Sequence, residues 1–185
     1  MSRVGEHIDP LLQLCLKGDQ KAQLEIYNRY YKAMYNTALR IVKDTAEAED
    51  VMQESFLNAF TKLDTFRGEV TFGAWLKKIV VNKSLMYYRN RKKRNEVDLD
   101  DKLYMVRDND VAEAVHPDTE QLAQKVLATM DTLKENYRVS LTLHLVEGYD
   151  YEEICSLMNI SYANCRTMIS RAKESLRKKL EPVLS

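Results

Sequence analysis

The stretch KKIVVNKSLMYYRNRKKR, at residues 77–94, carries eight lysines or arginines and no acidic residue. Its apolar residues are spaced so that one helix face can be buried while cations lie elsewhere around the helix, which predicts a single basic helix. The predicted buried stripe contains Ile79, Val80, Leu85 and Met86. Because Tyr87 and Tyr88 lie among the cations, the predicted helix combines positive charge with aromatic rings.

This combination suits a helix that meets nucleic acid. Cations neutralise phosphates and release counterions, and flat rings stack on unpaired bases at roughly 1 to 3 kcal/mol each. The mixture therefore favours a melted or single strand. For a basic run taken alone, however, the commoner role is a solvated face above core tyrosines. The choice between the two depends on the rest of the chain.

Charge is segregated along the chain. The formal net charge of the 185 residues is zero, which would argue against a nucleic-acid partner if the charges were evenly spread. Residues 44–54 hold five acids and no base, and residues 96–120 hold nine acids against two bases. Residues 166–179 hold six bases against one acid. The alternation of acidic and basic segments favours separate binding functions for separate segments.

The three cysteines indicate neither a disulfide framework nor a zinc site. Cys15, Cys155 and Cys165 form no CxxC motif and have no histidine at metal-ligand spacing, so each is expected to be a small core residue. No apolar run reaches the length of a membrane span, and the N-terminus lacks the apolar segment of a signal peptide. We expect a cytoplasmic protein without membrane insertion, metal or cofactor.

The sequence predicts an all-α fold of two small helical domains, residues 1–95 and 118–185, joined by an acidic linker at 96–117. Only five glycines and three prolines interrupt segments with helical spacing, and no segment reads as a strand. Residues 11–17 are expected to form a short helix that ends at Gly18, followed by a helix over residues 20–42. The side chains expected to be buried from this second helix are Leu24, Tyr27, Tyr31, Tyr35 and Leu39.

A further helix is expected to begin after Asp44, because Asp44 and Glu47 have capping-box spacing. Its predicted buried stripe contains Ala48, Val51, Met52, Ser55, Phe56, Ala59, Phe60 and Leu63. Its polar face contains Glu47, Asp50, Gln53, Glu54 and Asn58. No Glu-x-x-His pair supports a carboxylate metal site. Two interpretations remain, a solvated face with acids favoured near a helix N-terminus, or a docking face for a basic partner.

The C-terminal part predicts a helix-turn-helix. Helices are expected from Asp118, burying Leu122, Val126, Met130 and Leu133, and over residues 139–147, ending at Gly148. A capping box at residues 150–153 opens a short helix, and Ser161 can cap the next one. The last helix is expected to turn inward Cys165, Ile169, Ala172, Leu176 and Leu180. Its N-terminal polar and basic residues suit a major groove.

Three blocks of sequence resemble the extracytoplasmic-function group of the bacterial sigma-70 family, over nearly the whole chain. AEDVMQESFLNAF (48–60) is similar to the segment that docks on the clamp coiled coil of RNA polymerase's largest subunit. FRGEVTFGAWLKKIVVNKSLMYYRNRKKR (66–94) is similar to the part that melts and reads the minus-ten element. YEEICSLMNISYANCRTMISRAKESLRKKL (151–180) is similar to the helix-turn-helix that reads the minus-35 element. The acidic linker corresponds to the family's connector toward the polymerase active site.

The resemblance implies three sets of contact residues. The set expected to bind core RNA polymerase is Asp50, Gln53, Glu54, Phe56 and Asn58. The set expected at the minus-ten element is Phe66, Arg67, Lys77, Lys78, Asn82, Lys83, Tyr88, Arg89 and Arg91. The set expected at the minus-35 element is Ser161, Tyr162, Asn164, Arg166, Thr167, Ser170, Arg171 and Lys173.

Several positions depart from the family pattern. Met86 stands where the family usually has an acid, and Met168 stands where it usually has an arginine. Residues 163–165, Ala-Asn-Cys, replace the common Gly-Thr-Val, and Val81 replaces an alanine. These departures leave the expected fold intact and bear on the promoter sequence. The resemblance also admits an anti-sigma factor as a further partner.

The expected function is that of a transcription initiation factor, which binds core RNA polymerase and promoter DNA as duplex and as melted strand. The alternative is a DNA-binding regulator that uses only the helix-turn-helix and acts without core polymerase. Such a regulator has no need of the basic helix at 77–94 or of an acidic linker. A stand-alone enzyme is not expected, because the chain has no recognisable nucleophile and base, metal cluster or phosphate-binding glycine loop.

Overall fold

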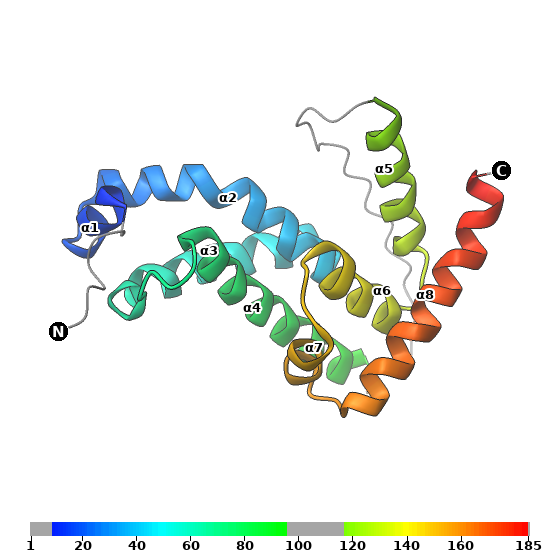
Figure 1. Cartoon of the computed structure of the whole chain (residues 1–185). Helices are drawn as coiled ribbons and strands as arrows, with labels where there is room; N and C mark the ends of the chain where they lie inside the picture. The colour runs from blue at the N-terminus through cyan, green and yellow to red at the C-terminus, as the bar shows by residue number, and fades with distance from the viewer. Residues whose placement is uncertain (1–8, 96–116, 185) are drawn as a thin grey trace. The chain divides into compact units, whose positions relative to one another are not determined.

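The computed structural model describes residues 9–95 and 117–184, and within them the protein is helical, with no strand. The chain divides into two compact units, each of which is described by itself (Figure 1). This confirms the predicted all-α class. The predicted acidic linker at 96–117 lies outside the described residues, except for Pro117, which begins a helix.

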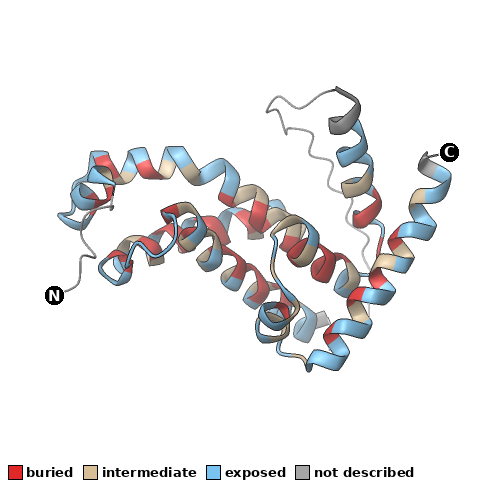
Figure 2. Cartoon of the chain, in the orientation of Figure 1, coloured by how far each residue is buried: buried red, intermediate tan, exposed pale blue. Residues whose placement is uncertain are grey.

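The first unit contains α1 (Pro10–Leu16), α2 (Gln20–Val42), α3 (Thr45–Thr61), the 3-10 turn η1 (Leu63–Thr65) and α4 (Phe72–Asn95). Helices α2, α3 and α4 pack against one another in pairs, and α1 packs on α2. Figure 2 shows that the buried residues follow the facing sides of these helices. Burial of these apolar side chains is the main source of stability for such a bundle.

Short-range capping residues begin the helices where the sequence predicts. Asp19 Oδ1 accepts a hydrogen bond from Ala22 N at 2.9 Å, and Asp44 Oδ1 accepts one from Glu47 N at 2.8 Å. Each carboxylate satisfies a backbone donor that has no partner within its helix. The helix starts at Gln20 and Thr45 are therefore encoded locally.

The predicted buried face of α2 is wrong in part. Leu24 and Tyr31 are 59% and 44% exposed, and the buried side chains belong to a neighbouring face of the helix. The buried residues of α2 are Ala22, Ile26, Met34, Thr37, Ala38, Ile41 and Val42. Tyr27, Tyr35 and Leu39 lie at the edge of the core. A tyrosine has a polar end that is cheapest to leave in water, so these rings occupy the rim rather than the centre.

The buried stripe of α4 also differs in one residue. Val80 and Leu85 are buried as predicted and Ile79 is partly buried, whereas Met86 is exposed. Val81 and Ser84 take part in the buried side instead. Helix α4 begins at Phe72, so Trp75 lies in its first turn, where it packs against the core.

The second unit contains α5 (Pro117–Asp131), α6 (Glu135–Leu141), the π-turn η2 (Thr142–Val146), α7 (Tyr151–Met158) and α8 (Tyr162–Leu184). Helix α8 packs against α5, α6 and α7. The core of this unit consists of Met130, Leu133, Val139, Leu141, Leu143, Ile154, Cys165, Ile169, Ala172 and Leu176. Leu122, predicted to be buried, is exposed.

The segment predicted as a helix over 139–147 contains a widened turn. Helix α6 starts earlier, at Glu135, and passes at Thr142 into the π-turn, where Glu147 N donates to Thr142 O at 2.9 Å. Gly148, at φ +80°, follows the turn. Across both described segments, no helix has the length and apolar character needed to span a bilayer.

Candidate nucleic-acid and partner interfaces

The helix-turn-helix is built from reciprocal caps. Asp150 Oδ1 accepts from Glu153 N at 2.8 Å, and Glu153 Oε2 accepts from Asp150 N at 3.1 Å, which completes the predicted capping box of α7. Asn159 ends α7 in the left-handed conformation, at φ 54°. Ser161 Oγ then accepts from Asn164 N at 3.3 Å and caps α8. These bonds set the turn between the two helices.

Helix α8 presents a polar and basic face beyond this turn. Cys165, Ile169, Ala172 and Leu176 are buried, as predicted, and hold the opposite side of the helix on its unit. Seven of the eight residues predicted to contact the minus-35 element are exposed: the cap Ser161, and on the helix Tyr162, Asn164, Arg166, Thr167, Ser170 and Arg171. A helix end with exposed amide, hydroxyl and guanidinium groups matches the donors and acceptors of a major groove.

Two residues of α8 differ from this group. Lys173 is half-buried, and its Nζ lies 3.2 Å from Nε2 of His144 in the π-turn. Met168 is half-buried and lies beside the buried face, three residues from Cys165. The side chain at position 168 is therefore at the margin of the exposed face rather than at its centre.

Helix α4 carries an exposed row of residues on one side. The row consists of Lys78, Asn82, Met86, Arg89 and Lys93, which follow one another at steps of three or four along the helix. Asn82 Nδ2 donates to Lys78 O at 2.9 Å. The row combines cations, an amide and one apolar side chain, a mixture suited to a phosphate backbone and to base faces. Met86 was not among the predicted contacts, and only its exposure identifies it.

Two predicted DNA contacts on α4 instead pair with α3. Lys83 Nζ lies 2.7 Å from Glu54 Oε2, and Arg91 Nη1 lies 3.1 Å from Glu47 Oε2. Arg91 also donates to the carbonyl of Val42. Two carboxylates of the acidic face of α3 are thus directed to a basic helix of the same unit.

Tyr87 reinforces the contact between α3 and α4. Its hydroxyl donates to Glu54 Oε1 at 3.0 Å. The hydrogen bond from Lys83 is the main cause that lowers the pKa of the Glu54 carboxyl, and the bond from Tyr87 adds to it. Burial raises the pKa of the Tyr87 hydroxyl, and its bond to the Glu54 carboxylate raises it further. Glu54 therefore keeps its negative charge, with its carboxylate accepting from two donors, Lys83 and Tyr87.

The outer face of α3 has a composition that the sequence did not reveal. Asp50 and Gln53 are exposed, and Leu57, one turn beyond Gln53, is 68% exposed. Asn58 is half-buried. Phe56, predicted to contact polymerase, is 3% exposed and packs against Tyr27 at a ring distance of 4.8 Å. Because Phe56 belongs to the core, Leu57 is the accessible apolar side chain of this face.

Aromatic residues predicted at the minus-ten element are mostly buried. Tyr88 is 5% exposed, so its ring is not available for stacking on a base. Phe66 packs edge-on against Phe72 at 5.8 Å and against Trp75 at 5.3 Å. These ring contacts fix the residue after η1 to the start of α4. The residues between them, at 67–71, are exposed and include Arg67 and the apolar Val70.

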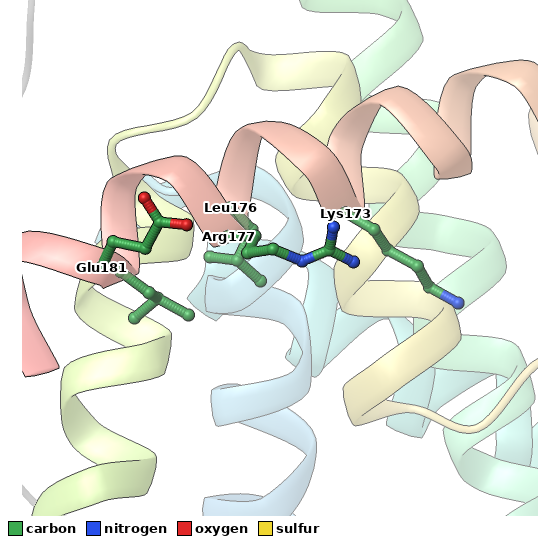
Figure 3. A pocket seen from close by; sticks show the side chains of 5 residues that line it. Lys173, Leu176, Arg177 and Glu181 are labelled. Carbon is green, nitrogen blue, oxygen red and sulfur yellow. The ribbon is translucent and has the colours of Figure 1, made fainter.

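A shallow hollow lies along the C-terminal half of α8 (Figure 3). Its lining residues are Lys173, Leu176, Arg177, Leu180 and Glu181. The two leucines supply an apolar base, and the charged side chains are spread along one helix instead of converging on a point. A small-molecule site needs convergent polar groups, so this hollow suggests none. In the part of the chain that is described, no three metal-binding side chains cluster.

Two models of known families match the chain, one on each unit. Sigma-70 region 2 matches residues 26–94, and Sigma-70, region 4, matches residues 123–176. The first match covers most of α2, all of α3 and nearly all of α4, and the second runs from within α5 through α7 into α8 as far as residue 176.

Relatives match over nearly the full length. The chain is 32% identical over 181 residues to the ECF RNA polymerase sigma-E factor of Escherichia coli strain K12, which covers 94% of each chain. It is 30% identical over 186 residues to the RNA polymerase sigma-H factor of Pseudomonas aeruginosa, covering 97% of this chain and 96% of the relative.

Solved structures share the fold. One is the sigma factor RpoE in complex with the anti-sigma factor NepR from Bartonella quintana, with a TM-score of 0.59 at 19% identity over 85% of this chain and 95% of that one. Another is CnrH in complex with the cytosolic domain of CnrY, with a TM-score of 0.52 at 22% identity over 93% and 96% of the two chains.

Proposed function

The chain belongs to the extracytoplasmic-function group of the sigma-70 family. From this premise we propose which of its helices bind polymerase and which bind promoter DNA during transcription initiation. The protein binds core RNA polymerase and directs promoter recognition, DNA melting and initiation. The observation that carries this function is that region 2 and region 4 both match, in order and on separate units. A regulator that acts without polymerase would leave the region 2 unit without a role.

The outer face of α3 is the proposed contact with core polymerase. Asp50, Gln53 and Leu57 lie on one exposed face of α3, at helical spacing. An exposed leucine bordered by an acid and an amide has the composition of a protein contact, with an apolar centre and a polar rim. Asn58 borders this face, and Glu54 joins it to α4. Phe56 supports the face from within the core.

The exposed row of α4 and the loop before it are the proposed contacts with the melted minus-ten strand. Lys78 and Arg89 would follow the phosphates, and Asn82 would meet a base edge. Arg67 lies in the exposed loop, three residues before the exposed Val70. Lys77 is half-buried at the start of the helix. Unstacking a base step costs a few kcal/mol, and such contacts would have to offset it.

The exposed end of α8 is the proposed reader of the minus-35 duplex. Arg166 is the main candidate for a base contact, because a guanidinium can bind a guanine edge through two donors. Asn164 and Thr167 lie beside it, and Arg171 lies further along the helix. The polymerase supplies the chemistry, so no catalytic residue is assigned to this chain.

Partners and location follow from the same assignment. We propose that the protein works in the cytoplasm with core RNA polymerase and promoter DNA. RpoE and CnrH were each solved bound to another protein, NepR and the cytosolic domain of CnrY. We therefore propose that an anti-sigma factor binds this chain as well.

Reconstitution tests the function. Purified full-length protein, mixed with core polymerase at moderate salt, should co-migrate with it in gel filtration. The assembled holoenzyme should start transcripts from a restricted set of genomic fragments that core enzyme alone does not use. Binding to duplex DNA without any association with core polymerase would contradict the proposal.

A further inference from the structure

His144 lies at the junction of three segments of the second unit. It belongs to the π-turn, and its Nδ1 lies 3.1 Å from the carbonyl oxygen of Tyr149, in the connection to α7. Its Nε2 lies 3.2 Å from Nζ of Lys173 in α8. One half-buried imidazole thus ties the turn, the connection and the recognition helix together.

These partners determine which imidazole nitrogen carries the proton. A carbonyl oxygen only accepts, so Nδ1 must be the donor to Tyr149. In the neutral ring Nε2 is then an acceptor, and the lysine ammonium, which only donates, is the partner that matches it. His144 therefore accepts one hydrogen bond from Lys173 and leaves the other two ammonium hydrogens for another acceptor.

The widened turn is part of this arrangement. The π-turn is a rare geometry that costs regular helix hydrogen bonds and occurs often at functional sites. In it Leu143 is fully buried, while the next residue, His144, reaches α8. Tyr149 N donates to Leu143 O at 2.9 Å, which holds the connection against the turn. The backbone around His144 is therefore fixed from both sides.

Aromatic contacts extend from His144 to the start of α8. Its ring lies 5.0 Å from the ring of Tyr151, which lies 6.4 Å from the ring of Tyr162. Tyr162 and Lys173 both belong to the residues predicted to meet the minus-35 element. His144 thus contacts the recognition helix directly at Lys173 and, through the ring of Tyr151, is linked to Tyr162, three turns away.

We propose that His144 is a positioning residue that holds the Lys173 ammonium for a phosphate of the minus-35 duplex. The inference rests on the proposed DNA-binding role of α8. Lys173 lies at the margin of the exposed face, where groove-flanking phosphates would lie when the face enters a groove. A free lysine loses rotamer entropy when it is immobilised on binding. Fixing the ammonium beforehand removes part of that cost.

Substitutions at both ends of the contact test this role. His144→Phe keeps a ring of similar size but removes the acceptor, His144→Gln keeps an acceptor near Nε2, and Lys173→Met removes the charge. The assay is binding of full-length holoenzyme to fluorescent promoter duplexes, enriched from a random pool by the wild-type holoenzyme, and to a scrambled duplex. Each is measured at several salt concentrations.

We expect Lys173→Met to make the slope of log affinity against log salt shallower by about 0.9, the value for one phosphate contact. His144→Phe should weaken binding to both duplexes by about 2- to 10-fold. His144→Gln should restore most of this loss. In the background of Lys173→Met, His144→Phe should have little further effect, because the ammonium that it positions is absent.

Two results would overturn the inference. One is that Lys173→Met leaves affinity and salt slope unchanged. The other is that His144→Phe weakens binding equally whether or not Lys173 is present. Thermal unfolding of each variant identifies loss of fold. If His144→Phe unfolds, the duplex affinities and salt slopes of His144→Gln and Lys173→Met still test the inference. A wild-type protein that binds neither polymerase nor promoter would refute the proposed function instead.

Discussion

Lys83 Nζ lies 2.7 Å from Glu54 Oε2, so one ion pair joins the helix proposed to meet DNA to the helix proposed to meet polymerase. Both side chains are partly exposed, at 28% and 44%. An exposed pair of this kind contributes modestly to stability, because solvent screens it and both side chains lose freedom. Its larger consequence is that Lys83 is already partnered by a carboxylate in the free protein.

The pH dependence of stability should reflect this pair. The pKa of Glu54 is lowered in the folded protein, so its contribution to stability is present above the pKa of the unfolded chain. It is lost as the pH falls through the lower pKa of the folded state. Glu54→Gln should therefore cost less than about 1 kcal/mol at neutral pH, and the difference from wild type should shrink in acid.

Denaturant unfolding at a series of pH values measures this difference. Glu69, an exposed acid in the loop before α4, provides the control. Glu69→Gln should not reproduce the pH-dependent difference. If the free energies of unfolding of Glu54→Gln and wild type differ by the same amount at every pH from neutral to acid, the ion pair adds no stability.

Gly73 is required by the close approach of Tyr30. A Cβ at position 73 would lie 2.9 Å from Tyr30 Cε1, and the Tyr30 ring is held against Phe72 at 5.5 Å. Alanine alone would favour the helix by about 1 kcal/mol. We expect the clash to dominate, so that Gly73→Ala destabilises the protein by about 1 to 2 kcal/mol.

The free energy of unfolding of a double variant isolates the cause. In the background of Tyr30→Ala the clash is absent, so Gly73→Ala should there be neutral or stabilising. If Gly73→Ala stabilises the protein with Tyr30 in place, the packing argument fails.

Arg166 and Lys178 should differ in whether their contacts with DNA depend on its sequence. Arg166 is exposed near the start of α8, whereas Lys178 lies far along it and pairs with Glu174 at 3.0 Å. Arg166→Ala should weaken binding to the matched minus-35 duplex by about 1 to 3 kcal/mol and relax sequence preference. Lys178→Ala should weaken binding to all DNA sequences alike and lower the salt dependence of binding. Equal losses on matched and scrambled duplexes for Arg166→Ala would rule out base readout there.

The thiols of the helix-turn-helix should differ in reactivity. Burial, with the neighbouring Cys155 thiol, raises the pKa of Cys165 to about 11, and Cys165 is fully buried. Since the thiolate is the nucleophile, Cys165 should react slowly at neutral pH. Peptide mapping after brief iodoacetamide treatment should find half-buried Cys155 labelled before Cys165. Labelling of Cys165 at an equal rate in folded protein would contradict its burial.

Features encoded by neighbouring residues were predictable from the sequence. The caps at Asp19, Asp44, Asp150 and Ser161 each need only a side chain and a backbone amide three residues away. The buried face of α8 follows from its helical spacing. The family resemblance supplied the functional class, and the relatives and family models confirmed it.

Features that depend on long-range packing were not predictable. Lys83 and Glu54 lie 29 positions apart, so nothing local indicates that they pair. The burial of Phe56 and Tyr88 depends on which faces of α2, α3 and α4 meet, and the same packing leaves Leu57 exposed. Tyrosines with helical spacing on α2 misled the assignment of its buried face. The π-turn around His144 has no simple sequence signal.

The affinity of the full-length protein for core polymerase shows whether the outer face of α3 is the polymerase contact. Leu57→Ala and Asp50→Lys alter the outer face of α3 with little effect on folding, because both side chains are exposed. Leu16→Ala, at an exposed leucine of α1, is the matched control. We expect each α3 variant to weaken the complex by at least about fivefold, and the control to leave it unchanged. Wild-type protein that fails to bind core polymerase at moderate salt, or α3 variants that bind as tightly as wild type, would contradict the account.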